Sequence, residues 1–312
     1  MNVLVTGANG FVGSALCMEL MRREHNVYGA TRELNALLTG VSVVKVGELD
    51  AHTDWSDALA NVDVVVHAAA RVHLVRNDAP DSLTQFRKVN VEGTLNLAIQ
   101  ATRKGIKRFV FLSSIKVNGE MTQSDQLFKP SSNYRPTDPY GLSKYEAEQG
   151  LLAVAEETGM EVVIIRPPLV YGVGVKANFA SMIKWINRGV PLPFGAIHNQ
   201  RSLVALDNLV SFIIHCIAHP KAANEVFLIS DGKDISTTEL LQKVAHAFGK
   251  NPLLVPVPVS LMKFFAKLLG RVDMADRLFG SLQVDSSKAN DLLGWRPVIT
   301  MDKQLKKMAE KF

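Results

Sequence analysis

The chain has 312 residues, of which 47% are hydrophobic and 21% charged, and its formal net charge is +5. This apolar content is sufficient for a large folded core, so the composition excludes disorder and fibrous repeats. The basic residues are scattered and form no blocks, so a nucleic-acid partner is not indicated, and an anionic small substrate is a sufficient explanation of the positive charge.

Two cysteines, Cys17 and Cys216, lie far apart within apolar segments. This argues against a disulfide framework or a Cys-rich metal site and favours a reducing cytoplasm. The chain enters a strand pattern at once, without the basic and hydrophobic regions of an export signal, and no apolar run is long enough to span a bilayer. We therefore expect a cytoplasmic protein that binds no metal.

Short β-branched runs alternate with stretches of helical spacing through the first half of the chain. The runs lack a polar face, which is typical of strands buried on both sides. The expected strands are 3–6, 27–30, 41–46, 62–68, 109–113 and 162–166, and the expected helices are 12–23, 90–104 and 140–158. This order predicts an α/β fold of the Rossmann type, with a doubly wound parallel sheet covered by helices on both faces.

After Arg166 the pattern loosens, because prolines and glycines break the chain into short pieces. The strand-like run 225–230 and the helical run 206–218 are expected to return to the main sheet, while helical runs at 237–248 and 261–269 build most of a C-terminal cap. We therefore expect a main domain over 1–170 with returns near 203–230. The smaller cap is expected over 171–202 and 231–312.

The segment 261–271 combines leucine, methionine and phenylalanine with lysine and arginine, a mixture also found in membrane-surface helices. A cap helix that packs its apolar side on neighbouring elements has the same composition. We expect the packed helix and no contact with a membrane.

The segment 6–13, TGANGFVG, directly follows the first expected strand and opens the first helix. Gly7 permits a sharp turn, Gly10 lets the backbone approach a pyrophosphate, and Gly13 lets helix and strand pack closely. The helix N-terminus supplies amide donors and partial positive charge to phosphates. The main domain is therefore expected to bind a dinucleotide, with contacts from Gly7, Asn9, Gly10, Phe11, Val12 and Gly13.

The end of the second expected strand lacks the carboxylate that binds a free ribose 2′-hydroxyl. It reads Thr31-Arg32-Glu33 instead. Arg32 could stack on adenine and pair with a 2′-phosphate, so NADP is favoured as the cofactor. Glu33 beside it leaves NAD open. The structural alternative is that Arg32 is a solvated arginine of the turn without a cofactor contact. Further cofactor contacts are expected from Thr31, from Glu48 and Leu49 at the adenine edge, and from Ala68, Ala69 and Ala70 beneath the cofactor.

Asp138 and Pro139 begin a helix in which Tyr140 and Lys144 stand one turn apart on one face. The phenol has an ordinary pKa near 10, and we expect the neighbouring ammonium and an oxidised nicotinamide to favour the phenolate. Such a pair can move a proton to or from a sugar hydroxyl. The same spacing also occurs by chance in many helices.

Two serines follow the strand 109–113, where side chains of a parallel sheet face the ligand crevice. Ser114 can bond the reacting oxygen, and Ser113 is a near substitute. Capping of the strand end is the structural alternative for either hydroxyl.

The TGANGFVG turn, Ser114, the Tyr140/Lys144 pair and Asn90 at the head of a helix together resemble the extended short-chain dehydrogenase/reductase family over nearly the whole chain. The resemblance implies a UDP-sugar site between the sheet and the cap, a catalytic triad of Ser114, Tyr140 and Lys144, and a homodimer formed through helices 90–104 and 140–158. By position it also implies cofactor contacts at Asn90, Leu112, Ser113, Tyr140, Lys144, Pro167 and Leu169. Substrate contacts are implied at His73, Lys116, Asn118, Asn178, Arg201 and Arg277. Of these, Asn178, Arg201 and Arg277 are expected to lie near the pyrophosphate.

The sequence departs from the family pattern at three places. Members that remove water carry Asp-Glu after the serine or threonine, whereas this chain has Ile-Lys at 115–116, which argues against dehydration. The usual Val-Tyr-Gly has Asn118 in place of tyrosine, and Leu169 replaces the asparagine before a later Val-Tyr-Gly. We therefore expect substrate contacts that differ from those of a UDP-glucose 4-epimerase.

The segments 113–120, 166–172 and 195–210 look most like bacterial enzymes of O-antigen and capsule synthesis. Those enzymes reduce UDP-4-keto-6-deoxy-N-acetylhexosamines, so we favour an NADPH-dependent 4-keto reductase of lipopolysaccharide or related synthesis. A UDP-glucose or UDP-N-acetylglucosamine 4-epimerase is the alternative. A non-catalytic NADP-sensing protein is a third interpretation, which the intact Ser114, Tyr140 and Lys144 disfavour.

Overall fold

The computed structural model describes residues 1–33, 40–72, 82–123, 126–132, 134–270 and 272–311, without the side chains of 177, 178, 273, 274 and 277. Seven parallel strands form the main sheet in the order β3-β2-β1-β4-β5-β6-β9. Their bounds are β1 Asn2–Thr6, β2 Asn26–Thr31, β3 Ser42–Lys45, β4 Val64–His67, β5 Arg108–Leu112, β6 Glu161–Arg166 and β9 Val226–Leu228. The predicted doubly wound parallel sheet is confirmed.

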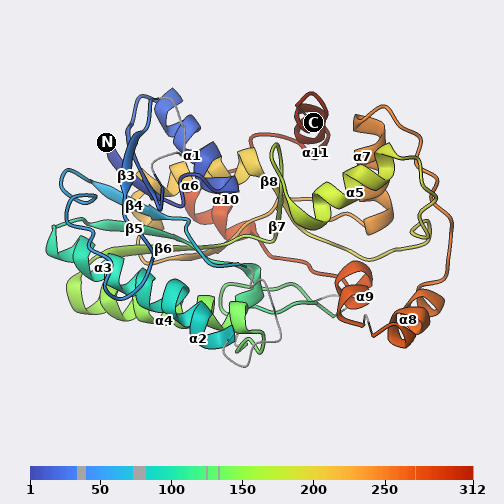
Figure 1. Cartoon of the computed structure of the whole chain (residues 1–312), viewed down its shortest axis with the longest axis horizontal. Helices are drawn as coiled ribbons and strands as arrows, with labels where there is room; N and C mark the ends of the chain where they lie inside the picture. The colour runs from blue at the N-terminus through green and yellow to red at the C-terminus, as the bar shows by residue number, and fades with distance from the viewer. Residues whose placement is uncertain (34–39, 73–81, 124–125, 133, 271, 312) are drawn as a thin grey trace.

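Helices cover both faces of this sheet (Figure 1). On one face lie α1 Phe11–Arg22, α6 Leu206–Ala218 and α10 Ser287–Leu293, and on the other lie α3 Gly93–Arg103 and α4 Pro139–Thr158. Within β1, Val3 and Val5 join the core under α1, whereas Leu4 joins the core under α3 and α4. The strands have no polar face because both of their sides are buried.

The expected strands and helices match the observed ones within a few residues, with one substantial correction. The helix expected from residue 90 begins earlier, as α2 Ser82–Arg87, and runs through the π-helical turn Lys88–Glu92 into α3. Asn90 therefore lies in the middle of a helical run and not at its head. π-Helical turns recur at functional sites because they redirect a side chain within a helix.

The remaining helices lie in the part of the chain expected to be the cap, and two short strands lie at its predicted boundaries with the main domain. Two short parallel strands, β7 Leu169–Tyr171 and β8 Leu203–Ala205, pair with each other. The helices are α5 Ala177–Asn187, α7 Thr237–Ala247, α8 Val259–Leu268, α9 Val272–Phe279 and α11 Met301–Ala309. A third core cluster joins α5, α7 and α11. The helical runs expected at 237–248 and 261–269 correspond to α7 and α8, and the division of the chain into two domains stays a prediction.

The expected packing of the 261–269 helix is wrong. No residue of α8 is buried, and its large apolar side chains are among the most exposed of the described part of the chain. α8 packs beside α9. Among the described residues, no helix has both the length and the apolar character needed to cross a membrane.

Candidate active site

The glycine turn joins β1 to α1 at the carboxyl end of the sheet. Gly7 has a φ of 66°, and a Cβ there would lie 2.9 Å from the backbone of Ala69. A Cβ on Gly13 would lie 2.1 Å from the carbonyl oxygen of Gly7. Since no side chain fits at either position, these two glycines set the close approach of turn, helix and neighbouring strand.

The start of α1 fits a diphosphate. Its N-cap, Gly10, provides no side-chain cap, and the first turn contains no acidic residue. Asn9 and Gly10 are exposed, while Phe11 and Val12 are half-buried. The first amides of the helix therefore lack a side-chain acceptor, and the positive end of the helix dipole favours an anion there.

The predicted adenosine contacts follow β2 and β3, which end at the same edge of the sheet. Thr31 is buried and its hydroxyl donates to the carbonyl of Glu33 at 2.8 Å, so this side chain shapes the turn that presents the exposed Arg32. Glu48 is exposed, and Leu49 packs partly against the core under α3. The carboxyl edge of a parallel sheet is where this fold binds the adenosine half of a dinucleotide.

The three alanines after β4, residues 68–70, are half-buried next to the glycine turn. The amide of Ala69 donates to the hydroxyl of Thr6 at 3.1 Å. That hydroxyl also hydrogen-bonds Nδ1 of His67 at 2.7 Å, and Nε2 of His67 lies 2.9 Å from the hydroxyl of Thr94. Burial lowers the pKa of His67 to about 3, so the ring is neutral and packed.

The structure brings the predicted triad together. Ser114 is the second residue after β5, and its hydroxyl lies close enough to the phenol of Tyr140 to lower the pKa of that phenol. Tyr140 is the second residue of α4, where the Asp138 carboxylate caps the helix by accepting from the Gly141 amide at 3.0 Å. Lys144 follows one turn later on the same face and is buried.

Burial changes the protonation of both catalytic side chains. It raises the pKa of Tyr140 to about 12 and lowers the pKa of Lys144 to about 7, although Glu148 partly opposes the second shift. The Lys144 ammonium lies 3.9 Å from the centroid of the Phe111 ring. In the protein without cofactor, desolvation of each group favours its neutral form, and the expected phenolate in the presence of an oxidised nicotinamide stays a prediction. The phenol keeps its proton at neutral pH.

Replacing Lys144 by methionine is expected to stabilise the free protein near neutral pH, by about 1–4 kcal/mol, because the buried amine is removed while its stem is kept. Folding lowers the Lys144 pKa from 10.5 to about 7. Between these values the unfolded chain binds the extra proton, so the stability of the wild type rises with pH through this window. Urea unfolding of both proteins at several pH values from about 6 to 10 should show a gain that is largest at and below pH ~7 and shrinks toward pH ~10. A gain independent of pH would contradict the assignment.

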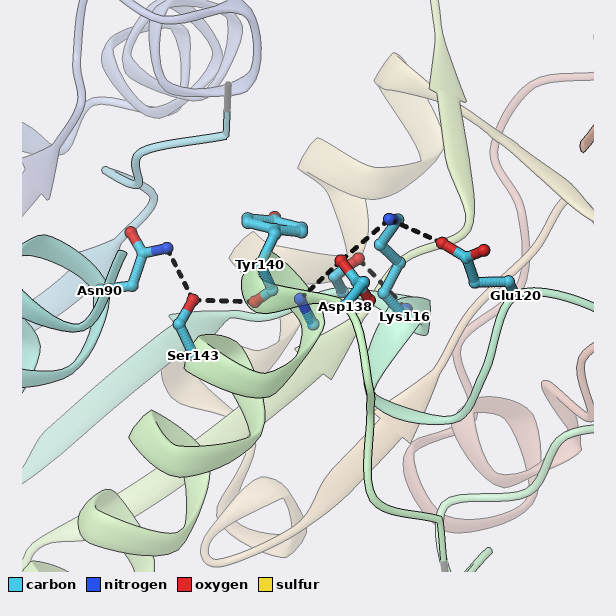
Figure 2. A network of polar contacts seen from close by, with 8 residues as sticks. Asn90, Lys116, Glu120, Asp138, Tyr140 and Ser143 are labelled. Atoms are coloured by element: carbon cyan, nitrogen blue, oxygen red, sulfur yellow. Dashed lines mark hydrogen bonds and ion pairs between the residues drawn. The ribbon is translucent and has the colours of Figure 1, made fainter. Parts of the chain in front are cut away.

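Lys116 lies on the opposite side of Tyr140 from Asn90 (Figure 2). Its ammonium lies 3.1 Å from the Asp138 carboxylate and 2.9 Å from the Glu120 carboxylate. The side chain is about one-third exposed, at 30%. Its predicted contact with substrate stays a prediction, and the structure adds that Lys116 fixes the residue that caps α4.

Asn90 joins a buried hydrogen-bond network that the sequence did not indicate. Its side-chain oxygen accepts from the Arg71 amide at 2.8 Å, and its nitrogen donates to the Arg71 carbonyl at 3.0 Å and to the Ser143 hydroxyl at 2.9 Å. Ser143 in turn donates to the Tyr140 carbonyl at 2.8 Å, as Figure 2 shows. The buried amide is therefore engaged by protein groups, and Asn90 ties the chain after β4 to the first turn of α4, while its predicted cofactor contact stays a prediction.

A buried polar network behind the triad contains two further predicted residues, Ser113 and Asn118. Glu148 and Arg166 form an ion pair at 2.5 Å, and the Ser113 hydroxyl donates to Glu148. The Asn118 side chain accepts from Arg166 at 3.0 Å and donates to the Lys129 carbonyl at 2.7 Å. Asn118 is only 1% exposed and stabilises the loop after β5, while its predicted contact with substrate and the role of Ser113 as a near substitute for Ser114 stay predictions.

The other predicted positions are distributed around the same edge of the sheet. Leu112 is half-buried at the end of β5, Pro167 is buried after β6 and accepts from the Ile115 amide at 3.0 Å, and Leu169 is exposed. These three contacts stay predictions.

The predicted pyrophosphate residues lie in the cap. Arg201 donates to the Gly280 carbonyl at 3.3 Å, and burial lowers its pKa. Asn178 is in α5 and Arg277 in α9, but their side chains are outside the described part, as is all of His73. Within the described residues, no group of three or more His, Cys, Asp or Glu side chains could hold a metal ion.

Sequence reasoning missed Phe111, Ser143 and Glu148. Glu148 is four residues after Lys144, so the helical spacing already placed this carboxylate on the catalytic face. Ser143 and Phe111 had no local signal, because their roles depend on Asn90 and Lys144 from other elements.

Comparisons with known proteins agree with this site. The family described as "NAD dependent epimerase/dehydratase family" matches residues 3–230. A protein of Vibrio cholerae called UDP-glucose 4-epimerase is 49% identical over 313 residues, covering 100% of this chain and 95% of that protein.

A more distant relative from Escherichia coli O157:H7, N-acetyl-alpha-D-glucosaminyl-diphospho-ditrans,octacis-undecaprenol 4-epimerase, is 30% identical over 84% of this chain and 77% of its own length. The solved structure of MoeE5 in complex with UDP-glucose and NAD is 26% identical, with a TM-score of 0.77, and covers 100% of this chain and 98% of that one. The chain therefore belongs to the NAD dependent epimerase/dehydratase family, within the extended short-chain dehydrogenases/reductases that its motifs indicate, and is an enzyme of that family.

Proposed function

We propose that the protein is a 4-epimerase of a UDP-hexose that uses a nicotinamide dinucleotide. The observation that carries this proposal is the placement of the Ser114 hydroxyl beside the Tyr140 phenol, with buried Lys144 one turn away, at the sheet edge that also holds the glycine turn. The whole-length relative called UDP-glucose 4-epimerase and the relative solved with UDP-glucose and NAD support the substrate class.

In this proposal the protein supplies the proton chemistry at the sugar's 4-hydroxyl. The bound nicotinamide would accept and return the hydride. Tyr140 would take the proton from O4 and later return it, Ser114 would donate a hydrogen bond to the same oxygen, and Lys144 would stabilise the phenolate. Because the neutral phenol is favoured in the free protein, the positive charge of the oxidised cofactor is needed to form the phenolate.

The structure weakens the preference for a 4-keto reductase that the sequence suggested. That preference depended on Arg32, Asn118 and Leu169, and Asn118 is buried in the network behind the triad. Leu169 and Arg32 are exposed and still favour the reductase as the second candidate. Ile115, directly after Ser114, is buried in a small core cluster, so no carboxylate stands where the dehydratases of this family carry one.

The deciding experiment is incubation of the purified protein with UDP-glucose, UDP-galactose or UDP-N-acetylglucosamine without added reductant, followed by chromatography. The epimerase predicts inversion at C4 without net change in cofactor. The reductase predicts no inversion, and consumption of one NADPH for each UDP-4-keto-6-deoxy-N-acetylhexosamine. The Tyr140→Phe variant should be inactive in either assay. Activity that remains in this variant would come from a contaminating enzyme.

We also propose that Arg32 gives NADP an advantage over NAD within this NAD dependent family. Arg32→Ala should weaken NADPH binding by about 2 kcal/mol, roughly 30-fold, through the loss of a charge-assisted pair, and should hardly affect NADH. Fluorescence titration with both cofactors measures this, with the exposed Arg103→Ala at the end of α3 as control. Equal losses of affinity for NADPH and NADH would show that Arg32 does not bind the 2′-phosphate.

Three expectations stay predictions. They are a homodimer formed through α3 and α4, a cytoplasmic location, and a role in lipopolysaccharide or related surface-polysaccharide synthesis. The sedimentation behaviour of the purified protein would test the first.

A further inference from the structure

An exposed apolar face lies on α8 in the cap. We call the α8 face the side chains of Leu261, Phe264, Phe265, Leu268 and Leu269. All five side chains are exposed, and Leu268 and Leu269 are the most exposed of them, at 67% and 74%. The preceding segment adds exposed Leu253 and Val255. A contiguous apolar surface of this kind on a folded protein marks a binding site for a membrane or for another molecule.

The arrangement of α8 shows that this face is not turned toward the protein. Its members recur at helical spacings of three, four, seven and eight residues, which places them on one side. Met262 and Ala266 are only half-exposed, so the opposite side is the one that the protein partly covers. α8 packs beside α9, with an ion pair of 3.0 Å between Lys263 and Asp276.

The segment that carries the α8 face is positively charged, and the Asp276 carboxylate of the neighbouring helix α9 offsets part of that charge by pairing with Lys263. From residue 249 to 272 the sequence contains four basic residues and no aspartate or glutamate. Lys263 and Lys267 are exposed on successive turns of α8. A second copy docking by the same face would bring these like charges together, whereas an anionic surface would be attracted.

We propose that the α8 face docks on an anionic phospholipid bilayer. The phenylalanine and leucine side chains would enter the boundary between headgroups and acyl chains, and the lysines would remain at the headgroups. Figure 1 places α8 at the end of the molecule farthest from the main sheet. Docking there leaves the glycine turn and the triad uncovered, so this property is independent of the proposed reaction.

The test is vesicle flotation of the full chain at low salt, with phosphatidylglycerol-containing vesicles and with pure phosphatidylcholine vesicles. The wild type should bind the anionic vesicles at least about tenfold more tightly than the neutral ones, and binding should weaken as salt is raised. The variant Phe264→Glu/Leu268→Glu should lose binding about tenfold or more, and Lys267→Gln about fivefold.

Val298→Glu is the matched control, because Val298 is another large apolar residue, 64% exposed, that lies before α11 and outside the α8 face. It should bind vesicles like the wild type. All substituted side chains are exposed, so circular dichroism and thermal unfolding should be unchanged in each variant.

Three results would overturn the proposal. The first is no flotation of the wild type, and the second is equal binding to neutral and anionic vesicles. The third is self-association of the wild type that Phe264→Glu/Leu268→Glu abolishes while vesicle binding is unaffected, which would make a second copy of the chain the occupant of the α8 face.

Discussion

Tyr140→Phe is expected to lower turnover by about 100-fold to 10,000-fold while the protein still folds and binds its cofactor. The substitution removes the phenolic oxygen that lies beside the Ser114 hydroxyl and keeps the ring, which packs edge-on against Phe86 at a centroid distance of 6.0 Å. In the described site, no other titratable side chain contacts Ser114. The variant therefore lacks the group that would accept the proton from the sugar oxygen and return it. The measurement is turnover of the nucleotide sugar that the wild type converts, together with a cofactor titration.

Tyr145→Phe on the same helix is the matched control and should retain nearly full turnover. Turnover of Tyr140→Phe within tenfold of the wild type would remove Tyr140 from the reaction. A large loss of cofactor affinity would instead assign the residue mainly to binding.

The parallel sheet and glycine turn could be predicted because their signals are local. Val3 to Val5 form an unbroken apolar run because both faces of β1 are buried, and the run passes directly into a turn whose glycines are each required. The Tyr140/Lys144 pair was predictable for the same reason, since helical spacing alone places both side chains on one face. Each of these inferences needed only neighbouring residues.

Asn118 shows what the sequence could not reveal. It occupies a position where the family has a tyrosine, and its side chain is bonded by Arg166, which is 48 residues away in the sequence. The pKa shifts of Tyr140 and Lys144 in the free protein were beyond the sequence for a related reason. The spacing predicts that the two groups are close, but the burial that determines both pKa values comes from elements that pack around them.

The predictions for the π-helical turn and for α8 failed for a different reason. The apolar periodicity around Asn90 predicts a helix, but it does not show that the helix begins at Ser82 or that it widens for one turn. In α8 the periodicity correctly predicts an amphipathic helix, while the expected partner for its apolar side is absent from the described fold. Hydrophobic spacing indicates which side is apolar, and it does not indicate what covers that side.

The buried ion pair behind the triad is expected to dominate the stability of this edge of the sheet. Glu148 accepts from Arg166 at 2.5 and 3.0 Å and from Ser113, and both members of the pair are almost fully buried. Glu148→Ala would leave the Arg166 guanidinium without a counter-charge in a low-dielectric site. The free energy of unfolding should fall by about 3–5 kcal/mol, as found when one partner of a buried pair is removed.

Urea unfolding of the cofactor-free protein measures this loss, and Glu157→Ala, at an exposed position of the same helix, should change stability by no more than about 0.5 kcal/mol. The double variant Glu148→Met/Arg166→Met removes both charges and fills the space, so it should be more stable than Glu148→Ala. A loss of less than about 1 kcal/mol in Glu148→Ala would mean that water or another group satisfies Arg166. If the loss is as large as expected, the network that contains Asn118 holds β5, β6 and α4 together, because its members come from those elements and the loop between them.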